Sequence, residues 1–141
     1  MTDEERRAIE ADCERLIKRY VNLNDAQDWP AVAALYTEDA VFRRPSGGDA
    51  IVGREAILAS LLARPPRVQR PVIANVVVDV EDEDHARAFS VIVLYQGDPL
   101  PEGLPAMSAS SPLVGTFADQ LVRTRDGWRF AERLGALDFA P

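Results

Sequence analysis

The sequence has few of the residues that disulfide and metal chemistry require. Cys13 is the only cysteine and His85 the only histidine among the 141 residues. A single cysteine cannot form an intrachain disulfide, and a single histidine excludes a two-histidine metal site within one chain. His85 follows the acidic residues 81–84 (EDED), where we expect it to be exposed. The sequence therefore predicts neither a metal nor an organic cofactor.

Dense basic runs and long apolar runs are also missing. Lys and Arg number 16 against 23 Asp and Glu, which gives a net charge of −7. This balance makes nucleic acid and anionic membranes poor partners. No stretch approaches the roughly 18 apolar residues of a membrane-spanning helix. Residues 3–5 (DEE) are acidic and the N-terminus has no apolar segment, so we expect no secretory signal and a cytoplasmic location.

The overall composition is that of a globular protein. Hydrophobic residues make up 47% and charged residues 28% of the chain. A chain of this length can bury roughly 68–70% of the surface that it exposes when unfolded, which suffices for a core. No internal repeat or linker interrupts the sequence. We therefore expect one domain over residues 1–141.

The first half of the chain is predicted to be mainly helical. Apolar residues recur with helical spacing over residues 3–24, which begin with a capping-box pattern at Thr2 and Glu5. Asp28 can cap a second helix, whose apolar spacing continues to Tyr36. Residues 40–43 form a short strand, and a third helix covers residues 53–64 before two prolines stop it.

The second half is predicted to consist of strands. Residues 72–80, 87–95, 113–124 and 128–137 are rich in β-branched and aromatic residues, and an Asp-Gly step joins the last two as a hairpin. Residues 97–112 form a loop with four prolines, of the length that often serves as a lid or binding loop. Helices followed by strands indicate the α+β class.

Several motifs together resemble the NTF2-like superfamily and its SnoaL-like members. They are residues 19–20 (RY), Asp28, 35–41 (LYTEDAV) and 53–57 (GREAI), followed by 115–119 (GTFAD) and 127–130 (GWRF). The first four resemble the N-terminal half of ketosteroid isomerases and SnoaL-like cyclases. The last two resemble the ending of the SnoaL-like group that includes the small subunits of ring-hydroxylating dioxygenases.

This resemblance implies a cone of α+β class, in which three N-terminal helices pack in a strongly curved, mostly antiparallel sheet around one pocket. It implies a small hydrophobic molecule as the partner. It also implies a homodimer, because an open sheet with an apolar outer face needs cover. Members include isomerases, dehydratases, cyclases, epoxide hydrolases and non-catalytic subunits, so the fold does not fix the function.

The chain departs from the catalytic residues of these relatives. Arg44 stands where ketosteroid isomerases keep a general-base Asp before a proline, and Phe117 stands near their second oxyanion-hole acid. Pro71 takes the place of a His that many SnoaL-like members carry four residues before an Asn, here Asn75. A simple ketosteroid-isomerase mechanism and a two-histidine dehydratase mechanism are therefore not expected.

Four residues remain as catalytic candidates: Tyr20, Asp119, Asn75 and Arg44. Tyr20 matches the oxyanion-hole tyrosine of the isomerases; it either donates to a substrate oxygen or is a core tyrosine. Asn75 interrupts an apolar strand and either points into the pocket or bonds locally. Asp119 either pairs with Arg133 on the neighbouring strand or acts as a general acid or base. Arg44 is either a solvated edge residue or an inward-facing anion-binding group.

Seven further residues are predicted to line the pocket. Tyr95 shares an alternating strand face with Phe89, and that face lines either the pocket or a subunit interface. Met107 either covers the pocket mouth or is exposed in the loop. The full set is Trp29, Tyr36, Phe42, Leu58, Tyr95, Met107 and Phe117.

Two functions are compatible with these patterns. The first is an enzyme that moves protons on a hydrophobic, oxygenated small molecule without a cofactor, as an isomerase, dehydratase, lyase or cyclase. The second is a non-catalytic binding or assembly domain that resembles the dioxygenase small subunits. The absence of the relatives' general base and histidine favours the second, and the remaining polar candidates favour the first.

Overall fold

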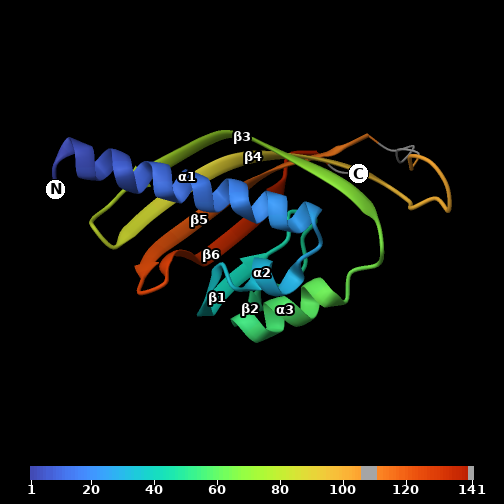
Figure 1. The fold of residues 1–141 in the computed structure, drawn as a ribbon, viewed down its shortest axis with the longest axis horizontal. Coiled ribbons are helices and arrows are strands. Elements are labelled where there is room, and N and C mark those ends of the chain that lie inside the picture. The colour runs from blue at the N-terminus through green and yellow to red at the C-terminus, as the bar shows by residue number, and fades with distance from the viewer. Residues whose placement is uncertain (106–110, 140–141) are drawn as a thin grey trace.

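The computed structural model describes residues 1–105 and 111–139. Met107, a predicted pocket residue, lies outside this range. The described residues form three helices and six strands, whose arrangement is shown in Figure 1. They are α1 (Asp3–Asp25), α2 (Trp29–Ala33), β1 (Tyr36–Arg43), β2 (Ile51–Val52), α3 (Arg54–Leu62), β3 (Val68–Val80), β4 (His85–Gly97), β5 (Leu113–Thr124) and β6 (Gly127–Leu137).

Helix α1 supplies the long apolar face against which the sheet closes. The Thr2 side chain accepts from the Glu5 amide, and the Glu5 carboxylate accepts from the Thr2 amide, so the predicted capping box is present. The apolar residues at helical spacing are all buried: Ile9, Cys13, Leu16, Ile17 and Tyr20. This face places the Tyr20 ring over the interior of the sheet, near the C-terminal end of the helix.

The six strands form one sheet in the order β2-β1-β6-β5-β4-β3. Strands β1 and β6 are parallel, and every other neighbouring pair is antiparallel. Figure 1 shows the long strands β3 to β6 curving over α1, while α2 and α3 lie beside β1 and β2. The predicted α+β class and the mostly antiparallel, curved sheet are confirmed.

The first strand begins four residues earlier than predicted. Helical spacing placed Tyr36 in the second helix, but α2 ends at Ala33 and Tyr36 is the first residue of β1. The Leu35 carbonyl accepts from the Phe130 amide at 2.9 Å, and the Tyr36 carbonyl accepts from the Arg54 guanidinium at 2.7 and 2.9 Å. Pairing with β6 and α3 therefore outweighs the local helical pattern.

Close backbone packing fixes the segment that follows β1. A Cβ added to Gly135 in β6 would lie 2.5 Å from the Pro45 backbone nitrogen, so only glycine permits this approach. The contact holds Arg44, Pro45 and Ser46 at the wide end of the sheet, near the start of β5 and the end of β6. Among the described residues, no helix is both long and apolar enough to cross a membrane.

Candidate functional site

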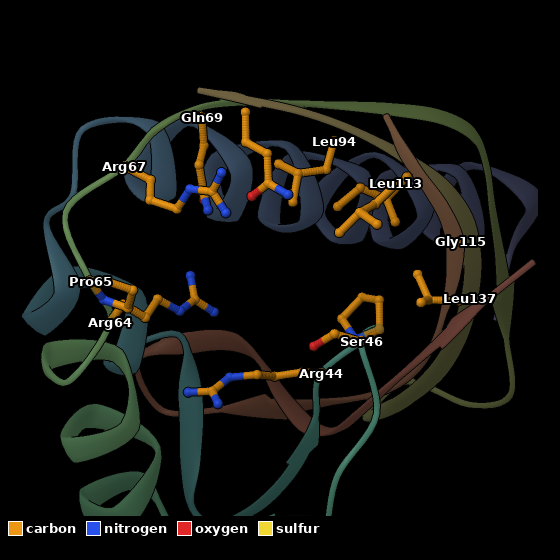
Figure 2. Close-up of a pocket in the computed structure, with 13 residues that line it drawn as sticks. Arg44, Ser46, Arg64, Pro65, Arg67, Gln69, Leu94, Leu113, Gly115 and Leu137 are labelled. Carbon is orange, nitrogen blue, oxygen red and sulfur yellow. The ribbon is translucent and has the colours of Figure 1, made fainter. Parts of the chain in front are cut away.

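Two connected hollows lie between the curved sheet, the end of α1 and the segments that flank α3. The outer chamber has a volume of about 360 Å³, and the inner chamber has a volume of about 90 Å³. Both chambers are lined by Pro45, Arg64, Gln69, Ile92 and Leu94, so the two chambers adjoin and together make up the cavity. Figure 2 shows the outer chamber, with Arg64, Arg67 and Gln69 on one side and Arg44 and Ser46 on another.

The inner chamber ends at a tyrosine pair. Tyr20 lines it, and the Tyr20 and Tyr36 hydroxyl oxygens lie 2.7 Å apart. Tyr36 is fully buried behind Tyr20, and this burial raises the pKa of Tyr36 well above its ordinary value. Tyr36 therefore stays neutral and can donate to the Tyr20 oxygen. In that arrangement the Tyr20 proton is available to a ligand in the chamber.

Arg133 lies behind this pair with its side chain wholly buried. Its guanidinium carbon is 4.4 Å from the Tyr20 ring centroid, 3.9 Å from that of Phe117 and 4.7 Å from that of Phe130. Aromatic faces attract cations, and the attraction strengthens where water is excluded. Arg133 therefore brings a positive charge under the ring of the tyrosine that faces the cavity.

Asp119 faces Arg133 across the β5–β6 ladder, the pairing that strand alternation predicts. Its Oδ1 atom lies 3.6 Å from Arg133 Nε, which is an ion pair without a hydrogen bond. Neither carboxylate oxygen of Asp119 has a hydrogen-bond partner among the described residues. Burial raises the pKa of Asp119 to about 6, and the charge of Arg133 opposes this shift.

The Asp119 carboxylate does not line either chamber. Phe117, two residues nearer the mouth on the same strand face, lines the inner chamber in its place. The Asp119 carboxylate is thus set back by one step along this strand face from the space where a ligand can sit. Asp119 is connected to that space through its ion pair with Arg133, whose guanidinium stacks on the Tyr20 ring.

Arg44 faces inward, which is one of the two positions that the sequence left open. It lines the outer chamber, and its Nη2 donates to the Ser60 carbonyl at 3.0 Å. The reason is the close contact between Pro45 and Gly135, which turns the end of β1 over the cavity. Its exposed neighbour Arg43 does not line the cavity.

Asn75 does not point into the cavity. It is exposed, and its φ of 52° coincides with a bulge between Ala74 and Val77 in the pairing of β3 with β4. Asparagine tolerates this left-handed backbone region better than most residues do. The prediction that Asn75 orients a ligand is therefore corrected: its position in the strand marks a bulge.

The other predicted lining residues have different positions. Phe42 and Phe117 line the inner chamber, and Tyr36 lies behind it. Trp29 lines an adjoining recess, where Arg64 stacks 5.2 Å from its ring centroid. Leu58 lines a separate hollow beside α2, so its assignment was wrong. Tyr95 lies on the outer face of β4, because its neighbours Leu94 and Gln96 are the residues that face the cavity.

The sequence analysis did not identify four polar residues that line the outer chamber. Arg64, Arg67, Gln69 and Gln96 all line the outer chamber. The sequence held one hint of them, because Arg64 and Arg67 flank the two prolines that follow α3. Proline has no amide hydrogen, so the backbone donates no hydrogen bond at those two positions. This hint did not say that these side chains face the same hollow as Arg44.

Among the described residues, no group of three or more His, Cys, Asp and Glu side chains is arranged to hold a metal ion. The polar groups of the cavity are instead hydroxyl, amide and guanidinium groups. Such groups bind oxygen atoms that carry partial or full negative charge.

Comparisons with solved structures find the same fold. A candidate scytalone dehydratase from Novosphingobium aromaticivorans is 20% identical and has a TM-score of 0.81, over 98% of this chain and 89% of that one. A ketosteroid isomerase-like protein from Erwinia carotovora atroseptica is 21% identical with a TM-score of 0.72, over 92% and 96% of the two chains. An NTF2-like protein with a cystatin-like fold, from N. aromaticivorans, is 25% identical with a TM-score of 0.72, over 93% and 82%.

A search of curated proteins finds no match. A sequence model of the SnoaL-like domain, in contrast, matches residues 5–134, which is nearly the whole chain. The match runs from the first turn of α1 to the residue after Arg133 in β6, so it includes every element that lines the cavity. The chain belongs to the SnoaL-like domain family, within the NTF2-like fold.

Proposed function

We propose that this protein is a cofactor-independent acid–base enzyme that acts on a hydrophobic, oxygenated small molecule in the cavity. The observation that carries the proposal is the Tyr20–Tyr36 hydroxyl pair at the inner end of a chamber whose apolar walls include Phe42 and Phe117. A buried hydroxyl that is already hydrogen-bonded to a second one is fixed in place before the ligand arrives. Such preorganised donors stabilise negative charge that develops on a substrate oxygen.

The reaction class that suits this arrangement is proton transfer next to a carbonyl, as in isomerisation or dehydration. When a C–H bond beside a carbonyl breaks, its electron pair moves onto the carbonyl oxygen as an enolate. Tyr20 would donate to that oxygen, Tyr36 would donate to Tyr20, and the charge of Arg133 under the Tyr20 ring would favour the anionic state. A water molecule beside the substrate would take the proton from carbon, and the return of a proton to another carbon of the enolate would complete the isomerisation.

For Asp119 we propose an indirect role. Its carboxylate is 3.6 Å from Arg133 and does not line the cavity. It would hold the guanidinium against the Tyr20 and Phe117 rings and so tune the hydroxyl of Tyr20. We therefore treat it as a positioning residue, in place of the general base that the sequence suggested.

The names of similar structures also support an enzyme. They include a candidate scytalone dehydratase and a ketosteroid isomerase-like protein, and both names refer to enzymes. At identities of 20% and 21%, these structures show a shared fold and no shared substrate.

The second candidate is a binding or assembly domain without chemistry. It is favoured by one observation: no carboxylate or imidazole is found among the described residues that line the two chambers. A strong general base contributes about 10²–10⁴-fold to proton transfer, and the cavity would lack that contribution.

We also propose that a second copy of the chain covers the outer face of the sheet. Large apolar side chains on this face of β3 and β4 are exposed: Val72, Val77, Phe89 and Tyr95. The ladder register places Val77 opposite Phe89 and Val72 opposite Val93, so these side chains form a continuous patch. Contiguous exposed apolar surface of this kind marks an interface.

Deuterium exchange into 2-tetralone, a bicyclic ketone without charge, tests the enzyme proposal. In D2O, proton NMR follows the loss of the protons beside the carbonyl. We expect exchange above the buffer rate with the native protein and a strong loss with Tyr20→Phe. If 2-tetralone binds but exchanges at the buffer rate, the binding-domain alternative replaces the enzyme.

A further inference from the structure

The mouth of the cavity gathers positive charge in a chain whose net charge is −7. Three arginines line the outer chamber: Arg44, Arg64 and Arg67. Arg44 is distant in sequence from the other two, which are separated by two prolines. Figure 2 shows all three side chains around the same hollow. No acidic residue is found among the described residues that line this chamber.

The neighbouring carboxylates do not neutralise this cluster. Asp98 lies 3.8 Å from Arg67, but its side chain is 86% exposed, and such surface pairs contribute little. Asp25 lines the adjoining recess, where its Oδ2 accepts from Arg70 at 2.9 Å. Counting Arg70 with the three chamber arginines, this end of the cavity has two more guanidinium groups than carboxylates.

Much of the hydrogen-bonding capacity of these arginines is unused. Arg44 and Arg67 each have a buried Nε with no hydrogen-bond partner among the described residues. Arg64 donates to the Asn24 side chain at a long 3.3 Å and stacks on Trp29. Unpaired donors on charged groups are costly, and an anion in the chamber would offset the charge of these guanidinium groups.

The electrostatics of Arg64 agree with this geometry. Burial lowers its pKa below the usual value, the nearby Tyr20 opposes the shift, and the charge of Arg44 adds to it. Arg64 is thus the arginine that connects the outer cluster to the tyrosine end, and it lines both chambers.

The walls beside the arginines are apolar. Ile92 and Leu94 line both chambers, Leu113 and Leu137 line the outer one, and Phe42 and Phe117 line the inner one. A molecule that spans both chambers therefore meets Arg44 and Arg67 in the outer one and the Tyr20 hydroxyl in the inner one. The walls between them are largely hydrocarbon, with Arg64 and Gln69 reaching both chambers.

We propose that the natural ligand is an organic acid with a hydrophobic body, whose carboxylate is held by Arg44, Arg64 and Arg67 while its reactive oxygen lies at Tyr20. This inference rests on the proposed function, because it names the substrate class of the same cavity. A carboxylate fits because a guanidinium presents paired donors that match its two oxygens. The arginines orient the molecule, and Tyr20 acts at its far end.

The test compares 2-naphthoate with 2-naphthamide, which share a ring system and differ in charge, together with neutral 2-tetralone. Affinities are measured by calorimetry for the native protein and for Arg44→Gln, Arg64→Gln and Arg67→Gln. Arg43→Gln is the matched control, because it removes the same charge one residue away, from an exposed side chain outside the cavity. Melting curves confirm that each variant is folded.

We expect the native protein to bind 2-naphthoate about tenfold more tightly than 2-naphthamide. Each chamber variant should remove most of this preference and leave the affinity for 2-naphthamide within about twofold, while Arg43→Gln keeps it. Raising the salt from about 50 mM to about 500 mM should weaken 2-naphthoate alone. The salt series uses the native protein alone, so it tests whether binding depends on the ligand's charge even if an arginine variant does not fold.

Equal affinity for 2-naphthoate and 2-naphthamide, or a preference that Arg43→Gln removes as fully as Arg64→Gln does, would overturn the proposal. In that case binding and exchange of 2-tetralone would still support the enzyme. If none of the three compounds binds, the proposed function fails together with this inference.

Discussion

The hydroxyl oxygens of Tyr20 on α1 and Tyr36 on β1 lie 2.7 Å apart, with the buried Arg133 guanidinium 4.4 Å from the Tyr20 ring centroid. Of these two tyrosines, Tyr20 lines the cavity and Tyr36 does not. The two tyrosines therefore have different expected roles: Tyr20 contacts the ligand, and Tyr36 fixes the direction of the Tyr20 hydroxyl.

This difference predicts unequal effects of the two phenylalanine substitutions. Tyr20→Phe should slow exchange of 2-tetralone by roughly 10²-fold, since it removes the donor itself. Tyr36→Phe should slow it about tenfold, because Tyr20 keeps its proton but loses its orientation. Each should cost about 1 kcal/mol of stability for the lost hydrogen bond. Exchange rates from NMR and melting temperatures check both expectations, and equal rates for the two variants would contradict them.

Asp119 predicts an unusual dependence of stability on pH. Its pKa is raised from 3.8 to about 6 in the folded state, so between these values the folded chain binds a proton that the unfolded chain does not. The protonated Asp119 therefore contributes to the free energy of unfolding at low pH, and this contribution is lost as the pH rises from about 4 through about 6. The shift of about 2 units corresponds to roughly 3 kcal/mol.

Asp119→Asn isolates this contribution, because asparagine has nearly the same shape and does not titrate. The variant should be more stable than the native protein at about pH 7, and the advantage should vanish near pH 4. Denaturant unfolding at both pH values measures the difference. A variant that is less stable than the native protein at pH 7 would show that the ion pair with Arg133 stabilises the fold on balance.

Arg133 should be more important for folding than its partner. Arg133→Met would leave the Asp119 carboxylate buried without a cation, at a cost of about 3–5 kcal/mol near pH 7. The cost should shrink near pH 4, where Asp119 is protonated, and in the double variant with Asp119→Leu. Chemical denaturation of the single and double variants provides the test. A loss that does not depend on pH would assign the effect to packing against the three rings.

The outer sheet face predicts the oligomeric state. The native protein should be a dimer, and Phe89→Lys should be a monomer, because the substitution puts a charge in the centre of the apolar patch. Val52→Lys is a suitable control, since Val52 is 66% exposed on β2 at the other edge of the sheet. Size-exclusion chromatography with light scattering measures the mass. A native monomer would contradict the proposed dimer.

Local patterns in the sequence predicted the parts of the fold that local physics determines. The buried face of α1 follows from apolar residues at helical spacing, and the Asp119–Arg133 pairing follows from strand alternation on either side of the Asp-Gly turn. Tyr36 was misplaced because its strand is defined by pairing with β6, which is distant in sequence.

The candidate site was harder to predict, because it depends on curvature. Arg44 and Arg64 meet only because the end of β1 turns over the cavity at Gly135, and no short-range pattern encodes that contact. Asn75 shows the opposite problem: a polar residue in an apolar strand suits a pocket and a bulge equally well, and the register of β3 with β4 decides between them.

The central claim is that the cavity ending at Tyr20 holds a small molecule, and one titration tests it most directly. Leu94 lines both chambers, so Leu94→Trp should fill the space, whereas Val52→Trp adds the same indole to an exposed site. Calorimetry with 2-tetralone should show binding to the native protein and to Val52→Trp and none to folded Leu94→Trp. Equal binding to Leu94→Trp would place the ligand elsewhere and contradict the account.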